Sequence, residues 1–138
     1  MASKSLADLA AKMRDIDIAI LATHSDGGTI AGRPMSNNSD VEYDGDSYYF
    51  TFDAARMVSD IEQDSNVALG FNDAGKFYMS VTGEAELIRD KSEFKAHWAP
   101  DLDAWFEDGI DTPGLVMIKV HAERIKYWDG EENGELTL

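Results

Sequence analysis

The sequence predicts a mainly β fold, an antiparallel β-barrel that is closed or nearly closed, with about six strands and three short peripheral helices. Apolar and polar residues alternate over several segments of strand length, and turn residues separate these segments. The helical segments are too few and too short to connect parallel strands, which favours a hairpin-like succession. A barrel this small fills its interior with side chains, so we expect a ligand to bind on its outside, where two copies of the chain meet.

Composition restricts the classes of function. The 138 residues suffice for a single domain, which we assign to 1–138, and the formal net charge is -15. Such a charge repels nucleic acids and anionic membranes, so a small anionic ligand must be held by a local concentration of positive charge. The chain has no cysteine, which excludes disulfides, thiolate nucleophiles and cysteine metal sites. We find no signal-peptide core and no stretch of transmembrane length, and we expect a cytoplasmic protein.

The chain opens with a helix and a strand. Apolar residues at helical spacing predict an amphipathic helix over 5–14, with Ser5 and Asp8 as its cap. The continuous apolar run 18–23 predicts a central buried strand, and residues 26–28 form the turn that follows it.

The stretch 29–56 organises the prediction of function. It reads as a strand, a hairpin with its turn at 44–45, a second strand that alternates over 47–52, and the start of a helix. It also carries Arg33 and Arg56 near the ends of these elements, in a chain that is short of positive charge. These two cations are the place where we expect the chemistry.

The rest of the chain continues the alternation of strands and short helices. We first expect a helix that ends at 63–66, followed by strands over 67–71 and 76–88, the second with a bulge at Gly83. A helix over 90–98, a helical turn over 102–106 and a loop over 109–114 come next. The chain then forms a strand over 115–120 that can continue to 128, and it ends in a flexible acidic tail over 129–138.

The order of charges along the helix that starts at Arg56 is unusual. Arg56 lies at the positive end of the helix dipole, whereas Asp60, Glu62 and Asp64 crowd the negative end. An anion bound at the first turn would make the position of Arg56 favourable. Alternatively, Asp53 caps the helix and simply pairs with Arg56 in solvent.

Motifs for metal binding and hydrolysis are missing. His24, His97 and His121 are scattered, with no HExxH pattern, and there is no G-x-S-x-G. We therefore predict no metal site, and the sequence identifies no catalytic residue.

Large aromatic residues gather in the last third of the chain. They either cap the core, which is the more common role of tryptophan, or form a wall for a flat aromatic ligand or a dimer contact. These residues are Trp98, Trp105, Phe106 and Trp128.

Several motifs together resemble one family. The chain is similar to the general stress protein branch of the pyridoxamine 5'-phosphate oxidase-like, FMN-binding split-barrel family over about residues 5–130. The motifs are LATHSDGGTIAGRPMS, DGDSYYFTFDAARMVSDI, YMSVTGEAELIRD, HWAPDLDAWFEDGIDTPGLVMIKV and YWDG.

This resemblance implies a split antiparallel β-barrel that forms a homodimer with FMN at the subunit interface. Arg33 contacts the flavin by its side chain, and Arg56 matches an arginine that binds the phosphate group. The other implied FMN-binding residues line the flavin through the backbone, lie beside its ring and ribityl chain, or close the site: Pro34, Met35, Ser36, Phe50, Thr51, Trp98, Trp105 and Phe106.

Two departures from the family pattern matter. The family often has serine and lysine, both phosphate contacts, where this chain has Ala55 and Met57, so we expect weak FMN binding. Losing one charge-assisted hydrogen bond costs about 1.5–3 kcal/mol, or roughly ten- to a hundred-fold in affinity. True pyridoxamine-phosphate oxidases have a basic carboxy-terminal segment, whereas this chain ends in EENGELTL, so we do not expect that oxidase activity.

The resemblance leaves two functions open. The first is an FMN-binding stress protein that acts as a flavin-dependent oxidoreductase, passing electrons between NAD(P)H and an unknown acceptor. The alternative is a non-catalytic dimeric barrel that acts as a flavin store or interaction module. A deazaflavin or haem cofactor has no support in these residues.

Overall fold

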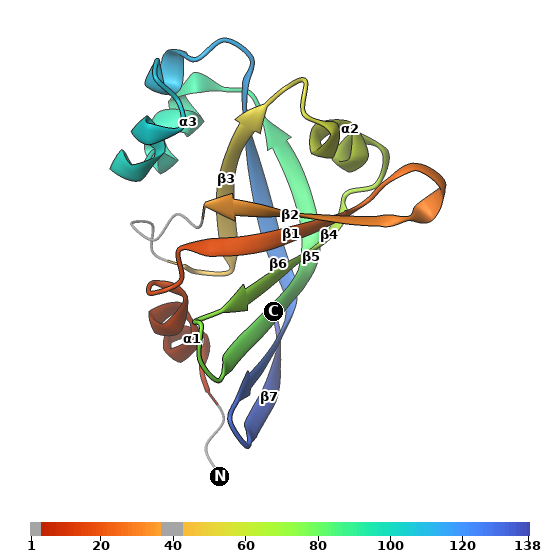
Figure 1. The fold of residues 1–138 in the computed structure, drawn as a ribbon, viewed down its shortest axis with the longest axis vertical. Coiled ribbons are helices and arrows are strands. Elements are labelled where there is room, and N and C mark those ends of the chain that lie inside the picture. The colour runs from red at the N-terminus through yellow and green to blue at the C-terminus, as the bar shows by residue number, and fades with distance from the viewer. Residues whose placement is uncertain (1–3, 37–42) are drawn as a thin grey trace.

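The computed structural model describes residues 4–36 and 43–138. Its seven strands form one antiparallel sheet that curls without closing, with the order β2-β1-β4-β5-β6-β3, and β7 added to β6 (Figure 1). The strands are β1 (Ile18–His24), β2 (Ile30–Ser36), β3 (Asp46–Phe52), β4 (Asn66–Asn72), β5 (Phe77–Ile88), β6 (Leu115–Asp129) and β7 (Glu132–Thr137). The α-helices are α1 (Leu6–Met13), α2 (Arg56–Gln63) and α3 (Lys91–His97). The mainly β, split-barrel prediction is thus confirmed.

The predicted hairpin over 29–56 is wrong. Strand β2 pairs with β1, and β3 pairs with β6, so these two strands are the opposite edges of the path through the sheet. Alternation correctly located both strands, but the period of two carries no information about which strand is the partner. The consequence is an open seam between the edges β2 and β3.

The bulge predicted at Gly83 is confirmed. The register of β5 against β6 shifts between Thr82 and Gly83. A Cβ atom at position 83 would overlap the carbonyl oxygen of His121, so the two backbones approach too closely for any side chain. This bulge lets the two longest strands bend around the core.

Helix α1 closes one end of the main core. The Ser5 side chain accepts a hydrogen bond from the backbone N–H of Asp8, whose carboxylate accepts one from the N–H of Ser5, and this confirms the predicted cap. Leu9 and Met13 on its inner face are buried among the apolar side chains of the sheet.

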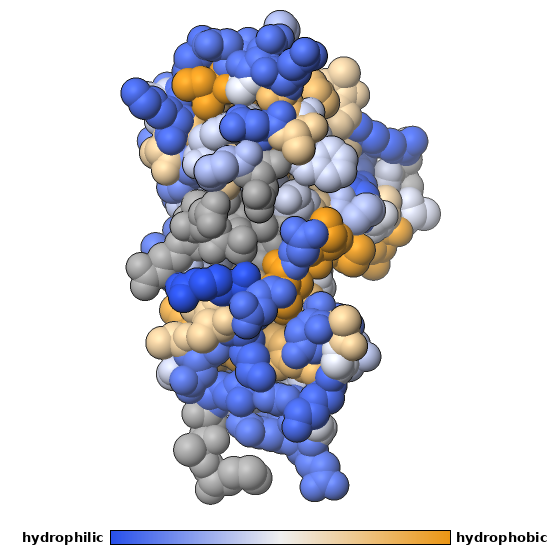
Figure 2. Space-filling model, turned by 60° about the vertical axis from the view of Figure 1, so that its left-hand side comes forward, coloured by the Kyte–Doolittle hydropathy of each residue, from blue (hydrophilic) through white to orange (hydrophobic). Residues whose placement is uncertain are grey.

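The sequence had led us to expect that strand β1 is buried on both faces, but only one of its faces is buried. Its side chains alternate, and Ile18 and Ile20 are 43% and 48% exposed on the outer face, while Ile30 of β2, opposite His24 at the far end of the strand pair, is 72% exposed. Figure 2 shows hydrophobic side chains gathered at mid-height of the molecule, between two more hydrophilic ends. The sheet therefore leaves an apolar outer face on β1 and β2.

A second apolar cluster lies on the far side of β3. Tyr49 faces the main core, whereas Phe50 faces a layer built by α3 and the 3₁₀ turns η2 (Pro100–Ala104) and η3 (Gly109–Asp111). Asp90 caps α3 by accepting a hydrogen bond from the N–H of Ser92. Both faces of β3 are thus packed against other parts of the chain, and its edge borders the open seam.

The predicted flexible tail is instead a strand. Residues of β7 pair with β6 in register from Asp129 opposite Glu132 to Arg124 opposite Thr137. Backbone hydrogen bonds to the long β6 strand order this acidic segment despite its polar composition. None of the helices in the described ranges is long and apolar enough to cross a membrane.

Candidate functional site

The open seam between β2 and β3 holds a cavity of about 350 Å³. Residues of these two edge strands, which do not pair with each other, line it together with residues of η2 and the segment that follows. Its lining is mostly apolar, with Ser36 and Thr51 as the polar side chains among Ile18, Pro34, Met35, Phe50, Met57, Leu102, Trp105 and Phe106. Volume and lining fit a small-molecule site.

Seven of the ten residues that the family resemblance implied line this cavity. They come from three separate parts of the chain, which only the fold brings together. They are Pro34, Met35 and Ser36 of β2, Phe50 and Thr51 of β3, and Trp105 and Phe106 after η2.

Trp98 lies behind the cavity. Its ring meets those of Phe50 and Phe106 edge-on, with centroids 4.9 Å and 5.8 Å apart, and its Nε1 donates a hydrogen bond to Asp103. Trp105, by contrast, lines the cavity while 67% exposed. Trp98 therefore belongs to a packed aromatic layer behind the cavity, whereas Trp105 presents an exposed ring to the cavity.

Arg33 and Arg56 do not line the cavity, but each directly precedes a residue that does, Pro34 or Met57, and both belong to a polar network with Asp60 of α2 at its centre. Thr23 accepts a hydrogen bond from Arg33 at 2.9 Å and donates one to Oδ2 of Asp60 at 3.0 Å. Ser25 accepts from Nε of Arg56 and donates to Oδ1 of Asp60, both at 3.2 Å. Arg33 also lies 3.6 Å from Asp60 Oδ2. The two arginines are therefore connected through one carboxylate.

Burial shapes the electrostatics of this network. Asp60 is only 4% exposed, and the Arg33 side chain is largely covered. Burial lowers the pKa of Arg33, and the negative charge of Asp60 acts in the opposite direction. The guanidinium group of Arg56, in contrast, reaches the network from an exposed residue.

The amino-terminal end of α2 has no side-chain cap. Ala55 occupies the N-cap position, and the first turn contains no acidic residue. Asp53 is not the cap and forms an ion pair with Arg89 at 2.7 Å. The helix terminus therefore keeps a positive dipole end next to Arg56.

Sequence reasoning missed part of the site. It did not place Leu102 and Ile18 in the cavity, nor Thr23, Ser25 and Asp60 in the network. For Asp60 the sequence did contain a signal of burial near Arg56. Asp60 lies between the apolar residues Val58 and Ile61, and it follows Arg56 by one helical turn.

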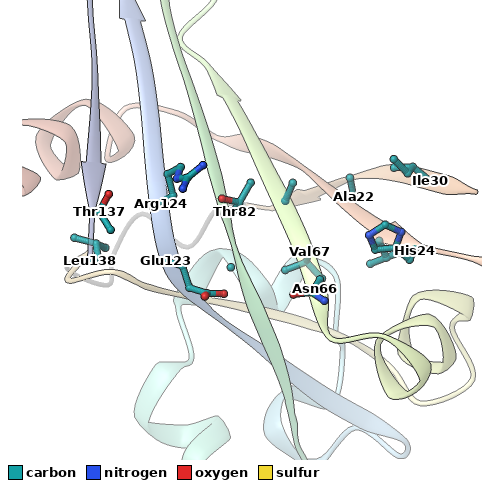
Figure 3. Close-up of a pocket in the computed structure, with 13 residues that line it drawn as sticks. Ala22, His24, Ile30, Asn66, Val67, Thr82, Glu123, Arg124, Thr137 and Leu138 are labelled. Carbon is teal, nitrogen blue, oxygen red and sulfur yellow. The ribbon is translucent and has the colours of Figure 1, made fainter. Parts of the chain in front are cut away.

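A second, wider groove of about 570 Å³ crosses the outer face of the sheet (Figure 3). Its labelled side chains run from Ile30 and His24 across Thr82 to Arg124 and Thr137. None of the ten implied residues lines it, but it continues the apolar face of β1 and β2.

Comparison with known proteins gives a consistent result. The profile of the family described as "Pyridoxamine 5'-phosphate oxidase like" matches residues 4–138. General stress protein 26 of Bacillus subtilis (strain 168) is 31% identical over 116 residues, which cover 78% of this chain and 79% of that protein. A protein of Clostridium acetobutylicum related to general stress protein 26 has a similar structure, with a TM-score of 0.82, 19% identity and coverage of 94% of this chain and 92% of that one. The general stress FMN/FAD binding protein of Xanthomonas citri superposes with a TM-score of 0.72, at 21% identity and 89% coverage of both chains.

Proposed function

This chain belongs to the pyridoxamine 5'-phosphate oxidase-like family, among the relatives of general stress protein 26, and from this premise we propose that it binds FMN between two identical subunits. The observation that carries the proposal is the cavity between β2 and β3, with two linked arginines beside it. The FMN/FAD binding protein of Xanthomonas citri shares the fold, which supports a flavin as the ligand.

The cavity suits the flavin ring. A flat heterocycle needs apolar walls and a few polar groups at its rim, and Phe50 and Met35 supply the former while Ser36 and Thr51 supply the latter. The exposed ring of Trp105 provides a cover on the open side.

The arginine network suits the phosphate group. Arg56 and the uncapped end of α2 offer a positive charge and helix dipole to an anion, and Arg33 adds a second guanidinium group. In a chain with a net charge of -15, this local cluster is what would hold a phosphate.

Binding is expected to be weak. Ala55 at the N-cap offers no hydroxyl, and Met57 turns an apolar side chain to the cavity where the family often has a cation. Each missing contact lowers affinity by roughly ten- to a hundred-fold.

The second subunit would cover the apolar outer face of β1 and β2. Ile18 belongs both to this face and to the cavity, so a copy seated on the face would border the ligand. Ile20 and Ile30 extend the face, and the groove of Figure 3 continues it. Large exposed apolar side chains on one face are typical of an interface.

The side chains that line the cavity limit the chemistry that the protein itself can contribute. No side chain among the described lining residues titrates near neutral pH, so the protein would bind, orient and shield its ligand rather than exchange protons with it. When bound, FMN supplies the capacity to accept and pass on hydride or single electrons. On the strength of this flavin chemistry, we propose a flavin-dependent oxidoreductase that uses NAD(P)H. The lack of an acid or base also favours the second candidate, a flavin store without catalysis.

Titration of the purified protein with FMN tests the proposal. Flavin fluorescence should be quenched, and Arg56→Ala should weaken quenching by about tenfold or more. Arg14→Ala, which removes an exposed arginine at the end of α1, is the matched control and should have no effect. Absence of quenching at about 50 µM FMN would contradict flavin binding. Bleaching of the bound flavin by NAD(P)H would then separate the oxidoreductase from the store.

A further inference from the structure

We propose that Asp60 is a positioning residue, which fixes the directions of Arg33 and Arg56 through the hydroxyl groups of Thr23 and Ser25 in the arrangement that a phosphate group requires. This inference rests on the proposed function, since the phosphate belongs to the flavin. It assigns a role to a buried carboxylate that does not itself touch the ligand.

The two hydroxyl groups act as matched relays. Each has a single proton, which it donates to one oxygen of Asp60, at 3.0 Å from Thr23 and 3.2 Å from Ser25. Its lone pairs then remain to accept from an arginine, Arg33 in one case and Arg56 in the other. Because an ionised carboxylate only accepts hydrogen bonds, Asp60 makes both hydroxyl groups donate to it, and each hydroxyl oxygen then accepts from an arginine.

The location of Asp60 is otherwise unfavourable. A carboxylate in the second half of α2 faces the negative end of the helix dipole, and at 4% exposure it has lost most of its water. Its neighbours Val58 and Ile61 are apolar and buried, so an apolar side chain would suit the packing. The hydroxyl groups and the nearby Arg33 compensate the buried charge and tie it to the phosphate side of the site.

Asp60 also carries a charge that repels a phosphate. Positioning and repulsion predict opposite effects of Asp60→Asn, which keeps the shape but removes the charge. If positioning dominates, Asp60→Asn weakens FMN binding. If repulsion dominates, Asp60→Asn tightens FMN binding, and the proposal is overturned.

NMR of the arginine side chains tests positioning without any flavin. In the wild type, the Nε–H signal of Arg56 should be ordered and protected from exchange, because Ser25 accepts its hydrogen bond. Ser25→Ala and Asp60→Ala should both speed the exchange of this Nε–H, while the exposed control Gln63→Ala should not. Ser25→Ala is the milder variant and keeps the test valid if Asp60→Ala fails to fold. Equally slow exchange of this Nε–H in folded Ser25→Ala protein would overturn the proposal.

Comparison of FMN with riboflavin, which lacks the phosphate group, tests the consequence for binding. The wild type should prefer FMN, and Ser25→Ala or Asp60→Asn should reduce this preference by about tenfold while leaving the affinity for riboflavin unchanged. Thr23→Val should reduce it through Arg33, and Thr23→Ser, which keeps the hydroxyl, should restore it. An unchanged preference in these variants would overturn the inference. If the wild type binds neither flavin, the proposed function fails, and the NMR measurement still decides whether Asp60 orients the arginines.

Discussion

The rings of Phe50 and Trp98 meet edge-to-face, with centroids 4.9 Å apart and planes at 68°. Phe50 lines the cavity, and Trp98 lies one layer behind it, where it also contacts Phe106. The cavity wall on the β3 side is therefore backed by a packed aromatic layer, which holds its shape before any ligand arrives.

Substitution of Trp105 should affect mainly ligand binding, whereas substitution of Phe106 should affect mainly the stability of the fold. Trp105→Ala removes an exposed ring, so we expect weaker flavin binding and a change of about 0.5 kcal/mol or less in the free energy of unfolding. Phe106→Ala empties a buried position and should cost about 3–5 kcal/mol. Denaturant unfolding and flavin titration of both variants check this. Equal losses of stability would contradict the distinction between an exposed cover and a buried support.

A cation at position 57 should strengthen FMN binding. Met57 lies in the first turn of α2 and lines the cavity, so Met57→Lys would bring an ammonium group to the phosphate side. One charge-assisted hydrogen bond should improve FMN affinity by roughly tenfold or more, with no gain for riboflavin. Gln63→Lys adds the same charge at the exposed far end of the helix and serves as the control. A gain with both lysine variants would indicate general charge attraction instead.

A charge on the outer face of β1 should separate the proposed subunits. Ile20→Glu places a carboxylate in the middle of that face, and desolvating it on association would cost several kcal/mol. Analytical ultracentrifugation should show a dimer for the wild type and a monomer for this variant. Ala96→Glu on the exposed side of α3 is the charge-matched control and should remain dimeric. A wild-type monomer would contradict the location of the site between subunits.

The bulge at Gly83 should tolerate no side chain. Gly83→Ala would drive a Cβ atom into the backbone at His121, and we expect a loss of about 1–3 kcal/mol as β5 and β6 shift. Gly70→Ala in the neighbouring strand β4 meets no atom within 4 Å and should change stability by about 1 kcal/mol or less. Thermal unfolding of the two variants provides the comparison.

The stability of the junction between β6 and β7 should decrease at acid pH. A hydrogen bond from Lys4 lowers the pKa of Asp129 below its ordinary value, so the stabilisation is complete above about pH 4 and is lost as pH falls through the folded pKa. Lys4→Ala should raise the pKa of Asp129, as measured by NMR titration of its carboxyl carbon. Lys95→Ala, on an exposed position of α3, should leave it unchanged.

Sequence patterns located most strands, the cap of α1 and the bulge, because these depend mainly on neighbours along the chain. They failed where distant segments decide the outcome. Strands β2 and β3 read as a hairpin because alternation does not encode pairing, and β7 read as a tail because its partner strand orders it. Seven implied residues met in one cavity, whereas Asp60 was considered only as one of three acidic residues at the negative end of the helix, since its burial arises only when α2 packs on β1.

A crystal structure of the complex with FMN tests the central claim most directly. We predict that the ring lies between Pro34–Ser36 of β2 and Phe50–Thr51 of β3, beside a second subunit, with the phosphate group within hydrogen-bond distance of Arg56. A ring bound elsewhere, or a phosphate group held by residues outside the Arg33–Asp60–Arg56 network, would contradict the account.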